Sequence, residues 1–265
     1  MRHYRLASKK LGDDATLTRY IRVGHSQGAP RKKIRQPKIP GLASAYIEEG
    51  RTRFGKSVKH VSEMRTLLVD GHSNVKIGHN VRKGKYRGYH IYTLSFEERK
   101  TCPRSCQHWQ TCYGNNMPYA KRIRHDDPEF LPRLEAEIAT LMRKPWPGIL
   151  IRLHALGDFY SIEYVAFWKR MLKAWPRLSV YGYTARNNED SIGEAVNRLR
   201  GTQWDRFAIR SSNGARHNMA TVSIGSVESR PASAFVCPEQ TGQTRCCATC
   251  GLCWSTRKNV AFLEH

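Results

Sequence analysis

The stretch GILIRLHALGDFYSIEYVAFWKRMLKAWPRLSVYGYTA, residues 148–185, decides the fold class. Residues 148–156 form a short apolar run, which is typical of a buried strand, and this strand ends at Gly157 and Asp158. Residues 161–175 are predicted to form a helix with Ser161 as its N-cap, and residues 178–185 form the next predicted strand. A strand, a helix and a strand in this order predict two parallel strands joined by a crossover helix.

The same alternation continues on both sides of this stretch. Further strands are predicted at residues 90–96, 205–212, 220–226 and 233–237, and further helices at 126–144 and 191–200. The helix at 126–144 has Asp127 as its predicted cap and Pro128 in its first turn. Residues 57–69 are expected to form a separate short helix.

These elements are too few for a closed eight-stranded barrel, which needs about 250 residues. We therefore expect an α/β fold with either a partial (β/α)6-type barrel or an open parallel sheet. The chain divides into a basic, flexible arm at residues 1–45, an α/β domain at 46–236 and a cysteine-rich metal-binding segment at 237–265.

The charge of the chain points to a polyanionic partner. Lys and Arg number 45 against 22 Asp and Glu, which gives a net charge of +23 at pH 7. Nucleic acid is the first expectation for such a partner, with DNA favoured over RNA. The residues expected to contact phosphates are basic and lie in the arm or just before the strand at 90–96: Arg31, Lys32, Lys33, Arg35, Arg82, Lys83, Lys85 and Arg87.

Two further classes of protein are not expected from this sequence. No run approaches the roughly 18 apolar residues of a membrane span, so no membrane partner is expected. The stretch MRHYRLASKKLGDD at the N-terminus has no apolar core of a signal peptide. We therefore expect a cytoplasmic protein.

The eight cysteines fall into two tight groups, which favours metal ligands over a disulfide framework. The first group is C-x3-C-x5-C and the second lies near the C-terminus; together they comprise Cys102, Cys106, Cys112, Cys237, Cys246, Cys247, Cys250 and Cys253. Four thiolates of the second group suit Zn²⁺ or a 4Fe-4S cluster, with Cys246 as an alternative to Cys247. The first group either takes His108 as a fourth zinc ligand or leaves one iron of a 4Fe-4S cluster open.

Polar residues also stand where the predicted strands end, and in βα folds such ends share one face. Arg152 and His154 are expected on the same side of their strand, with Asp158 as general base, nucleophile or binder of an ammonium group. The competing interpretation of Asp158 is a cap of the next helix. Gly157 permits a tight turn, and the first cysteine group, Tyr183, Thr184, Arg186 and Cys237 complete the expected face.

Four segments together resemble the phage gene product 88 family: residues 94–115, 151–172, 180–187 and 236–254. The resemblance extends over about residues 75–265 and leaves the arm outside. It implies a protein of a phage or prophage, working in the cytoplasm of the bacterial host cell.

More distantly, the chain is similar to radical S-adenosylmethionine enzymes, which have a partial barrel. That resemblance implies an open 4Fe-4S cluster at Cys102, Cys106 and Cys112, with Tyr113 as the adjacent aromatic residue. Gly157 and Asp158 would bind the methionyl amine, and the C-terminal cysteines would hold an auxiliary cluster. The spacing C-x3-C-x5-C departs from the usual C-x3-C-x2-C. The implied function is modification of a DNA base or nucleotide.

Two alternatives remain open. The chain is also similar to zinc-containing barrel transglycosylases that exchange guanine for a 7-deazaguanine base, with Asp158 as nucleophile and zinc at the C-terminal cysteines. That alternative leaves the first cysteine group without a role. The other alternative is a non-catalytic zinc protein that binds nucleic acid.

Overall fold

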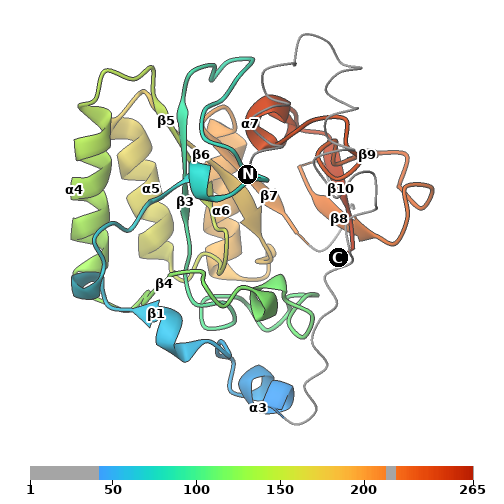
Figure 1. Ribbon diagram of the computed structural model, residues 1–265, viewed down its shortest axis with the longest axis horizontal. Helices are drawn as coiled ribbons and strands as arrows, with labels where there is room; N and C mark the ends of the chain where they lie inside the picture. Colours follow the sequence, from blue (N-terminus) through green and yellow to red (C-terminus); the bar gives the residue numbers. More distant parts are fainter. Residues whose placement is uncertain (1–41, 213–218, 265) are drawn as a thin grey trace, which may run out of the picture.

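The computed structural model describes residues 42–212 and 219–264, and its centre is a five-stranded sheet (Figure 1). The strand order is β2-β3-β5-β6-β7. The bounds are β2 Val69–Asp70, β3 His90–Leu94, β5 Ile149–Leu153, β6 Leu178–Thr184 and β7 Phe207–Ser211. The last four pair in parallel and β2 is antiparallel to β3. The predicted α/β class with a parallel-rich sheet is confirmed, and no closed barrel forms in the described ranges.

Residues 1–41, which make up nearly all of the predicted arm, lie outside the described residues. The predicted phosphate contacts Arg31, Lys32, Lys33 and Arg35 therefore lie outside them as well. The first described helix is α3, Leu42–Glu48.

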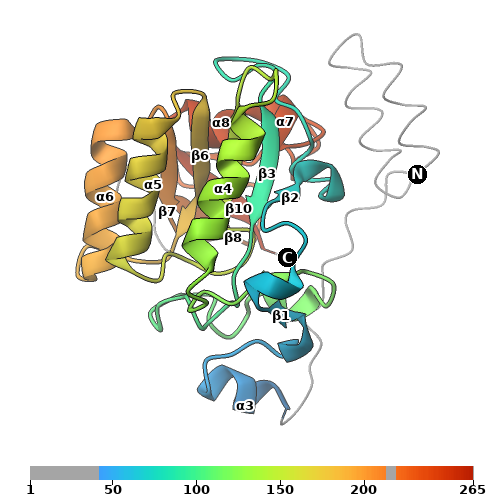
Figure 2. The same cartoon turned by 90° about the vertical axis from the view of Figure 1, so that its left-hand side faces the viewer.

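Three helices cover one face of the sheet (Figure 2). They are α4 Phe130–Met142, α5 Ile162–Ala174 and α6 Ser191–Gln203. The Ser161 hydroxyl accepts a hydrogen bond from the Tyr164 amide at 3.1 Å, so the predicted cap of α5 is confirmed. α4 starts later than predicted, because the Asp127 carboxylate accepts from the amides of Val61 and Glu129 and the helix begins only at Phe130.

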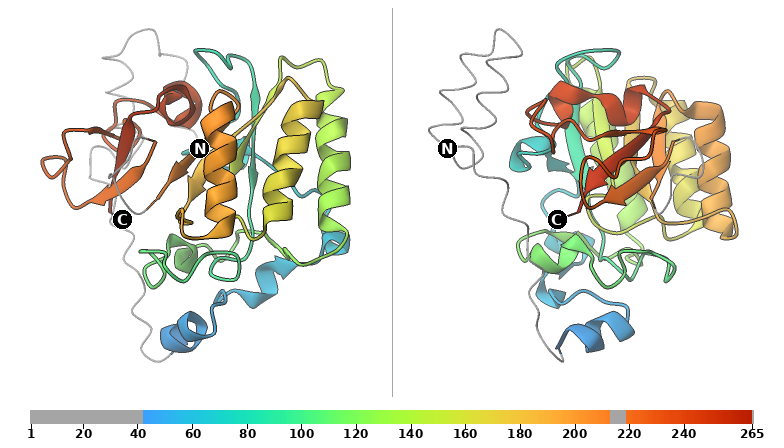
Figure 3. Two further views of the ribbon diagram at one scale, coloured as in Figure 1. Left: turned by 180° about the vertical axis from the view of Figure 1, so that it is seen from behind. Right: turned by 90° about the vertical axis from the view of Figure 1, so that its right-hand side faces the viewer.

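The C-terminal segment covers the opposite face of the sheet (Figure 3). Two short helices, α7 Cys247–Cys250 and α8 Leu252–Ser255, lie on this side. Ile91, Leu150 and Tyr181 project from three strands and pack in one buried cluster with Cys247 and Trp254. Burial on both faces explains why the strand at 149–153 reads as a nearly continuous apolar run.

A second sheet was not predicted. β8 Thr221–Ile224 and β9 Ala234–Val236 both pair in parallel with β10 Asn259–Leu263, a strand that the sequence analysis missed. The strands predicted at 220–226 and 233–237 therefore exist, and they belong to this second sheet. A single parallel bridge between Ser211 and Ala220 connects the two sheets. Residues 237–264 thus share a sheet with residues of the predicted α/β domain.

The predicted helix at residues 57–69 is also wrong. This stretch contains β1 Val58–Lys59, which pairs with β4 Arg122–Ile123, and a 3-10 turn at Val61–Glu63. The amides of Leu67 and Leu68 donate to the Glu137 carboxylate of α4, at 2.8 and 3.1 Å, rather than to carbonyls one turn earlier. Tertiary hydrogen bonds to α4 therefore replace the helix. None of the helices described has the length and apolar character required to span a bilayer.

Candidate functional site

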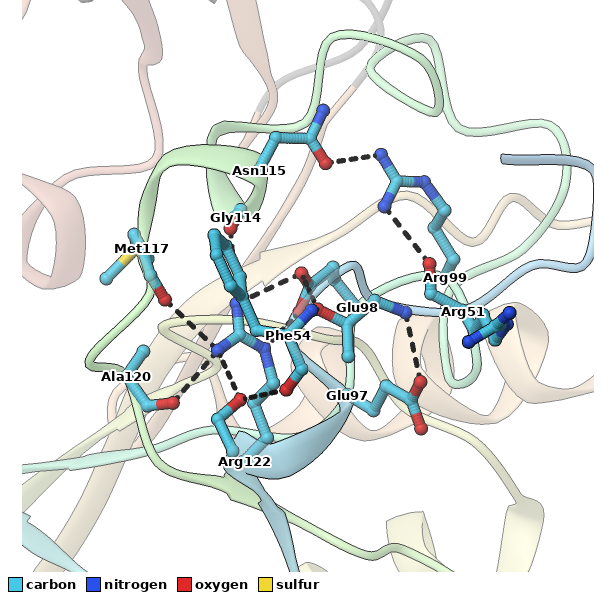
Figure 4. Close-up of polar contacts among 12 residues, drawn as sticks. Arg51, Phe54, Glu97, Glu98, Arg99, Gly114, Asn115, Met117, Ala120 and Arg122 are labelled. Carbon is cyan, nitrogen blue, oxygen red and sulfur yellow. Dashed lines mark hydrogen bonds and ion pairs between the residues drawn. The ribbon is translucent and has the colours of Figure 1, made fainter. Parts of the chain in front are cut away.

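The loop that carries the first cysteine group follows β3 and is held by a buried ion pair (Figure 4). Arg122 and Glu98 are 0% and 1% exposed, and Arg122 Nε lies 2.6 Å from Glu98 Oε2. The same guanidinium donates to the carbonyls of Gly114, Met117 and Ala120, at 3.1, 3.1 and 2.9 Å. Arg122 therefore fixes the chain directly after Cys112.

Arg99 holds the other side of this loop. Its guanidinium donates to the Asn115 side chain at 2.7 Å and the Arg51 carbonyl at 3.4 Å (Figure 4). It also donates to the Trp109 carbonyl at 3.0 Å. Sequence reasoning missed Glu98, Arg99 and Arg122. The charged run Glu97-Glu98-Arg99, placed between a buried strand and the cysteines, was the available signal.

The thiols of the first group lie within electrostatic range of one another, and those of Cys102 and Cys106 also lie within range of Asp158. Burial raises the pKa of Cys102 and Cys106, and the Asp158 carboxylate adds to both shifts. Burial also raises the pKa of Cys112 to about 11. The predicted fourth ligand, His108, has its Nε2 atom 3.0 Å from the Ser223 hydroxyl of β8, so this ring nitrogen is engaged outside the group.

Asp158 is 3% exposed and sits between the ends of β5 and β6. Its carboxylate accepts from the amides of Phe159 and Ala185 and from the Thr184 hydroxyl, each at 2.7 Å. Burial raises the pKa of Asp158 to about 6, although these hydrogen bonds act against the shift. A carboxyl group with this pKa exchanges protons near neutral pH. It does not cap α5, because Ser161 has that role.

His154 lies apart from Arg152, contrary to the expectation that both share one side of the strand. The strand ends at Leu153, and the His154 ring packs among Phe96, Phe159 and Tyr164 on the side of α5. Its Nε2 atom is 3.0 Å from the Tyr164 hydroxyl. Burial lowers the pKa of His154 to about 3, so the ring is neutral at physiological pH.

Arg152 projects from the opposite face, toward the C-terminal cysteines. Its guanidinium lies 4.5 Å from the ring centre of Tyr183 and within electrostatic range of Tyr113 and Cys247. In the described parts of the chain no carboxylate pairs with Arg152, and its Nε atom has no hydrogen-bond partner. Arg152 is half-buried, and a cation that is partly removed from water is stabilised by a nearby anion. A thiolate centre beside Cys247 would supply that negative charge.

Four cysteines of the second group surround one small cavity. Cys237, Cys247, Cys250 and Cys253 line a space of about 10 Å³. The Tyr183 hydroxyl donates to the Cys253 sulfur at 3.0 Å, which joins this cavity to the end of β6. Burial raises the pKa of Cys247, and the neighbouring Cys253 raises it further.

Cys246 does not line this cavity. Its sulfur lies 3.6 Å from the Thr249 hydroxyl, and its side chain faces a different pocket. Of the two adjacent cysteines, the structure therefore brings Cys247 to the other three.

The donor set fits a thiolate-bound metal. Four thiols around one space, beside the half-buried guanidinium of Arg152, suit tetrahedral zinc or a cluster. Across residues 42–212 and 219–264, no three His, Cys, Asp or Glu side chains already stand in a metal-coordinating arrangement. The thiols would therefore have to turn toward a common point on binding.

The remaining predicted residues have clear positions. Tyr113 is 48% exposed and its hydroxyl donates to the Ala155 carbonyl. Arg186 donates to the carbonyls of Phe159 and Thr101, at 2.6 and 3.0 Å, and pairs with Asp190. The exposed basic residues form a surface loop before β3: Arg82, Lys83, Lys85 and Arg87.

Gly157 has a φ of +85°, so the predicted turn is confirmed. An added Cβ would lie 2.7 Å from both Phe96 Cβ and Thr101 Oγ1. We expect Gly157→Ala to destabilise the fold by about 1–3 kcal/mol, measured by urea unfolding. Gly201→Ala is the control. Gly201 lies in α6, and a Cβ added there would meet open space, so this variant should be more stable than the unaltered protein by up to about 1 kcal/mol. Equal stability of both variants would contradict the expectation.

Comparison with known proteins identifies the family. No curated protein and no solved structure matches the chain. The profile of the family described as Gene product 88 matches residues 66–256, a range that includes both cysteine groups and Asp158. The chain therefore belongs to the Gene product 88 family.

Proposed function

We propose that the protein is an iron–sulfur enzyme that modifies nucleic acid. Cys102, Cys106 and Cys112 would hold a 4Fe-4S cluster, and a second metal centre would lie among Cys237, Cys247, Cys250 and Cys253. One observation carries the proposal: residues at the ends of β5 and β6 reach both cysteine groups. Asp158 lies within electrostatic range of Cys102 and Cys106, and Tyr183 hydrogen-bonds Cys253.

The chain's own residues have distinct tasks in this proposal. A 4Fe-4S cluster with S-adenosylmethionine would supply radical chemistry, as in the enzymes that the first cysteine group resembles. Asp158, with its pKa near 6, would hold or accept a proton or bind an ammonium group. Tyr113 is exposed beside the first group and would contact the cofactor or substrate. The exposed basic residues Arg82, Lys83, Lys85 and Arg87 would bind phosphates.

We also interpret the fold as a partial barrel. The parallel bridge between Ser211 and Ala220 continues the central sheet toward β8, β10 and β9. In this arrangement Cys237 directly follows β9 and lines the same cavity as Cys253. Tyr183, in β6, donates a hydrogen bond to the Cys253 sulfur. The C-terminal segment would then be a metal-binding cover on one side of the sheet.

A zinc-dependent DNA transglycosylase is the second candidate. The observation in its favour is the donor set, because four thiols around one cavity suit a single tetrahedral zinc ion. Asp158 would be its nucleophile, but that carboxylate is only 3% exposed and is held by three hydrogen bonds. A zinc protein that only binds nucleic acid would need neither Asp158 nor the first cysteine group.

Metal and acid-labile sulfide content of protein purified without oxygen tests these candidates. We expect about four or more irons per chain, with visible absorption near 400 nm. Replacing Cys102, Cys106 and Cys112 together with alanine should remove about four irons and leave the second centre. Cys247→Ser should empty the second centre, whereas the matched variant Cys246→Ser should keep it, because Cys246 lies outside the cavity.

A colourless protein with only zinc would contradict the iron–sulfur proposal. Asp158→Ala would then separate the remaining candidates. Loss of a covalent DNA adduct would support the transglycosylase, and unchanged salt-dependent binding would support a plain nucleic-acid-binding protein.

A further inference from the structure

A second pocket lies between residues 72–82 and the segment 245–249, and its volume is about 240 Å³. It shares no lining residue with the cavity among the four cysteines. Among the described residues, no carboxylate lines it. Its polar lining comprises a threonine, two histidines, two asparagines and two arginines: Thr249, His72, His79, Asn74, Asn80, Arg82 and Arg245. The lining is therefore positively charged, and an anion is the ligand that matches it.

His79 is held in a fixed orientation at the edge of this pocket. Its Nδ1 atom lies 2.7 Å from Asp70 Oδ1, and the same oxygen accepts from the His72 amide at 2.7 Å. The carboxylate holds the proton on Nδ1, so Nε2 of the neutral ring carries a lone pair and can accept a hydrogen bond from a ligand hydroxyl, such as the P–OH group of a singly protonated phosphate. The charge of Asp70 is thereby directed at the histidine and away from the pocket.

Asn80 adds a polar group that has no partner of its own. In the part of the chain that the structure describes, its buried Oδ1 atom makes no hydrogen bond. Because amide oxygen and nitrogen are assigned from their partners, either end of this side chain can face a ligand. A ligand that fills the pocket would therefore satisfy a group that is otherwise costly to bury.

The kind of anion follows from the number and shape of these donors. A guanidinium group presents parallel N–H donors that match two oxygens of a phosphate. The guanidinium groups of Arg82 and Arg245 together carry more N–H donors than one carboxylate accepts, and they suit a phosphate group with three free oxygens. We propose that this pocket binds a phosphomonoester, carried either by a free nucleotide or by the 5′ end of a nucleic acid. The phosphate argument needs no metal, and only the choice of a nucleotide carrier rests on the proposed function.

Calorimetric titration with inorganic phosphate and adenosine 5′-monophosphate tests the site. Arg82→Ala should weaken both by about tenfold or more, because a charge-assisted hydrogen bond is lost. Arg65→Ala is the matched control, since Arg65 is an exposed arginine outside the pocket and its loss changes the net charge equally. Equal weakening in both variants would show a diffuse charge effect and overturn the proposal. So would the absence of saturable binding by the unaltered protein at millimolar phosphate.

A DNA trinucleotide with and without a 5′ phosphate distinguishes the two carriers. Tighter binding of the phosphorylated trinucleotide than of adenosine 5′-monophosphate supports a nucleic-acid end, and the reverse order supports a free nucleotide. Asn80→Asp keeps the side-chain shape and adds a negative charge to the pocket, so it should abolish phosphate binding. Full binding by that variant, with an unchanged Tm, would overturn the site.

The test of phosphate binding can be distinguished from the test of the metal centres. The variant without Cys102, Cys106 and Cys112 should bind phosphate as the unaltered protein does, provided that its Tm shows it to be folded. Parallel loss of iron and of phosphate binding in that folded variant would contradict a separate pocket.

Discussion

Replacing Glu98 with alanine is expected to destabilise the fold by about 3–5 kcal/mol, because it leaves the Arg122 guanidinium buried without its anion. Both side chains are almost fully buried, and Glu98 binds Arg122 through both carboxylate oxygens, at 2.6 and 3.0 Å. The Thr52 hydroxyl would also lose its acceptor, which lies 2.7 Å away. Urea unfolding followed by circular dichroism measures the difference.

Glu194→Ala is the control for this variant. Glu194 pairs with Arg198 on the exposed face of α6, so its loss should cost less than about 1 kcal/mol. The double variant Glu98→Leu with Arg122→Met removes both charges and should recover part of the stability lost in Glu98→Ala, but not all of it, because the carbonyls of Gly114, Met117 and Ala120 lose their donor. Stability of Glu98→Ala within about 1 kcal/mol of the unaltered protein would contradict a large contribution from the charge pair.

Glu98→Ala should also reduce the amount of metal that the protein binds. Glu98 and Arg122 stand on either side of the loop with Cys102, Cys106 and Cys112, and Arg122 holds the carbonyls that follow Cys112. Glu98→Ala protein should therefore retain less iron than Glu194→Ala protein when both are purified without oxygen. Equal iron content would mean that the loop finds its position without the ion pair.

The second large expected effect is a loss of folding stability at low pH, caused by His154. Burial lowers the pKa of His154 from its ordinary value of 6.5 to about 3. Between these values the unfolded chain binds a proton that the folded chain does not, so stability is full above pH 6.5 and falls as the pH falls. The total loss down to pH 3 is about 5 kcal/mol, from about 1.4 kcal/mol for each pKa unit.

Asp158 acts in the opposite direction, so a matched variant is needed. Its folded pKa is raised from 3.8 to about 6, and it therefore contributes stability as the pH falls through 6. His154→Gln keeps a hydrogen-bonding group toward Tyr164 but does not titrate. The difference between this variant and the unaltered protein should shift by about 2 kcal/mol between pH 6.5 and pH 4.5, in favour of the variant at low pH. Parallel curves would show that His154 is not neutral in the folded state.

Periodicity and caps were sufficient to predict the elements around Asp158. The apolar run at 149–153 and the Ser161 cap are local signals, and local signals survive in the folded chain. The pairing of β8 and β9 with β10 is not local, because it depends on which strand edge is available once the chain has folded. The direction of the His154 side chain was predicted wrongly for a related reason. Side chains alternate between the two faces of a sheet only within a strand, and β5 ends at Leu153.

In the candidate site, too, local features could be predicted from the sequence and tertiary contacts could not. Spacing indicated that the C-terminal cysteines belong together, but the choice of Cys247 over Cys246 depends on where α7 begins. The partner of Asp158 at the end of β6, Thr184, was among the predicted residues because both follow strands. The arginines that hold the first loop were missed because their partners are mostly carbonyl oxygens, which leave no mark in a sequence.

The covering of the sheet by residues near the C-terminus has a consequence during synthesis on the ribosome. Ile91, Leu150 and Tyr181 leave the ribosome well before Cys247 and Trp254, the residues that bury them. The nascent chain therefore carries an open apolar face until these later residues emerge, and such surfaces promote aggregation. A chain cut before residue 246 would keep that face open, so such a truncation should aggregate.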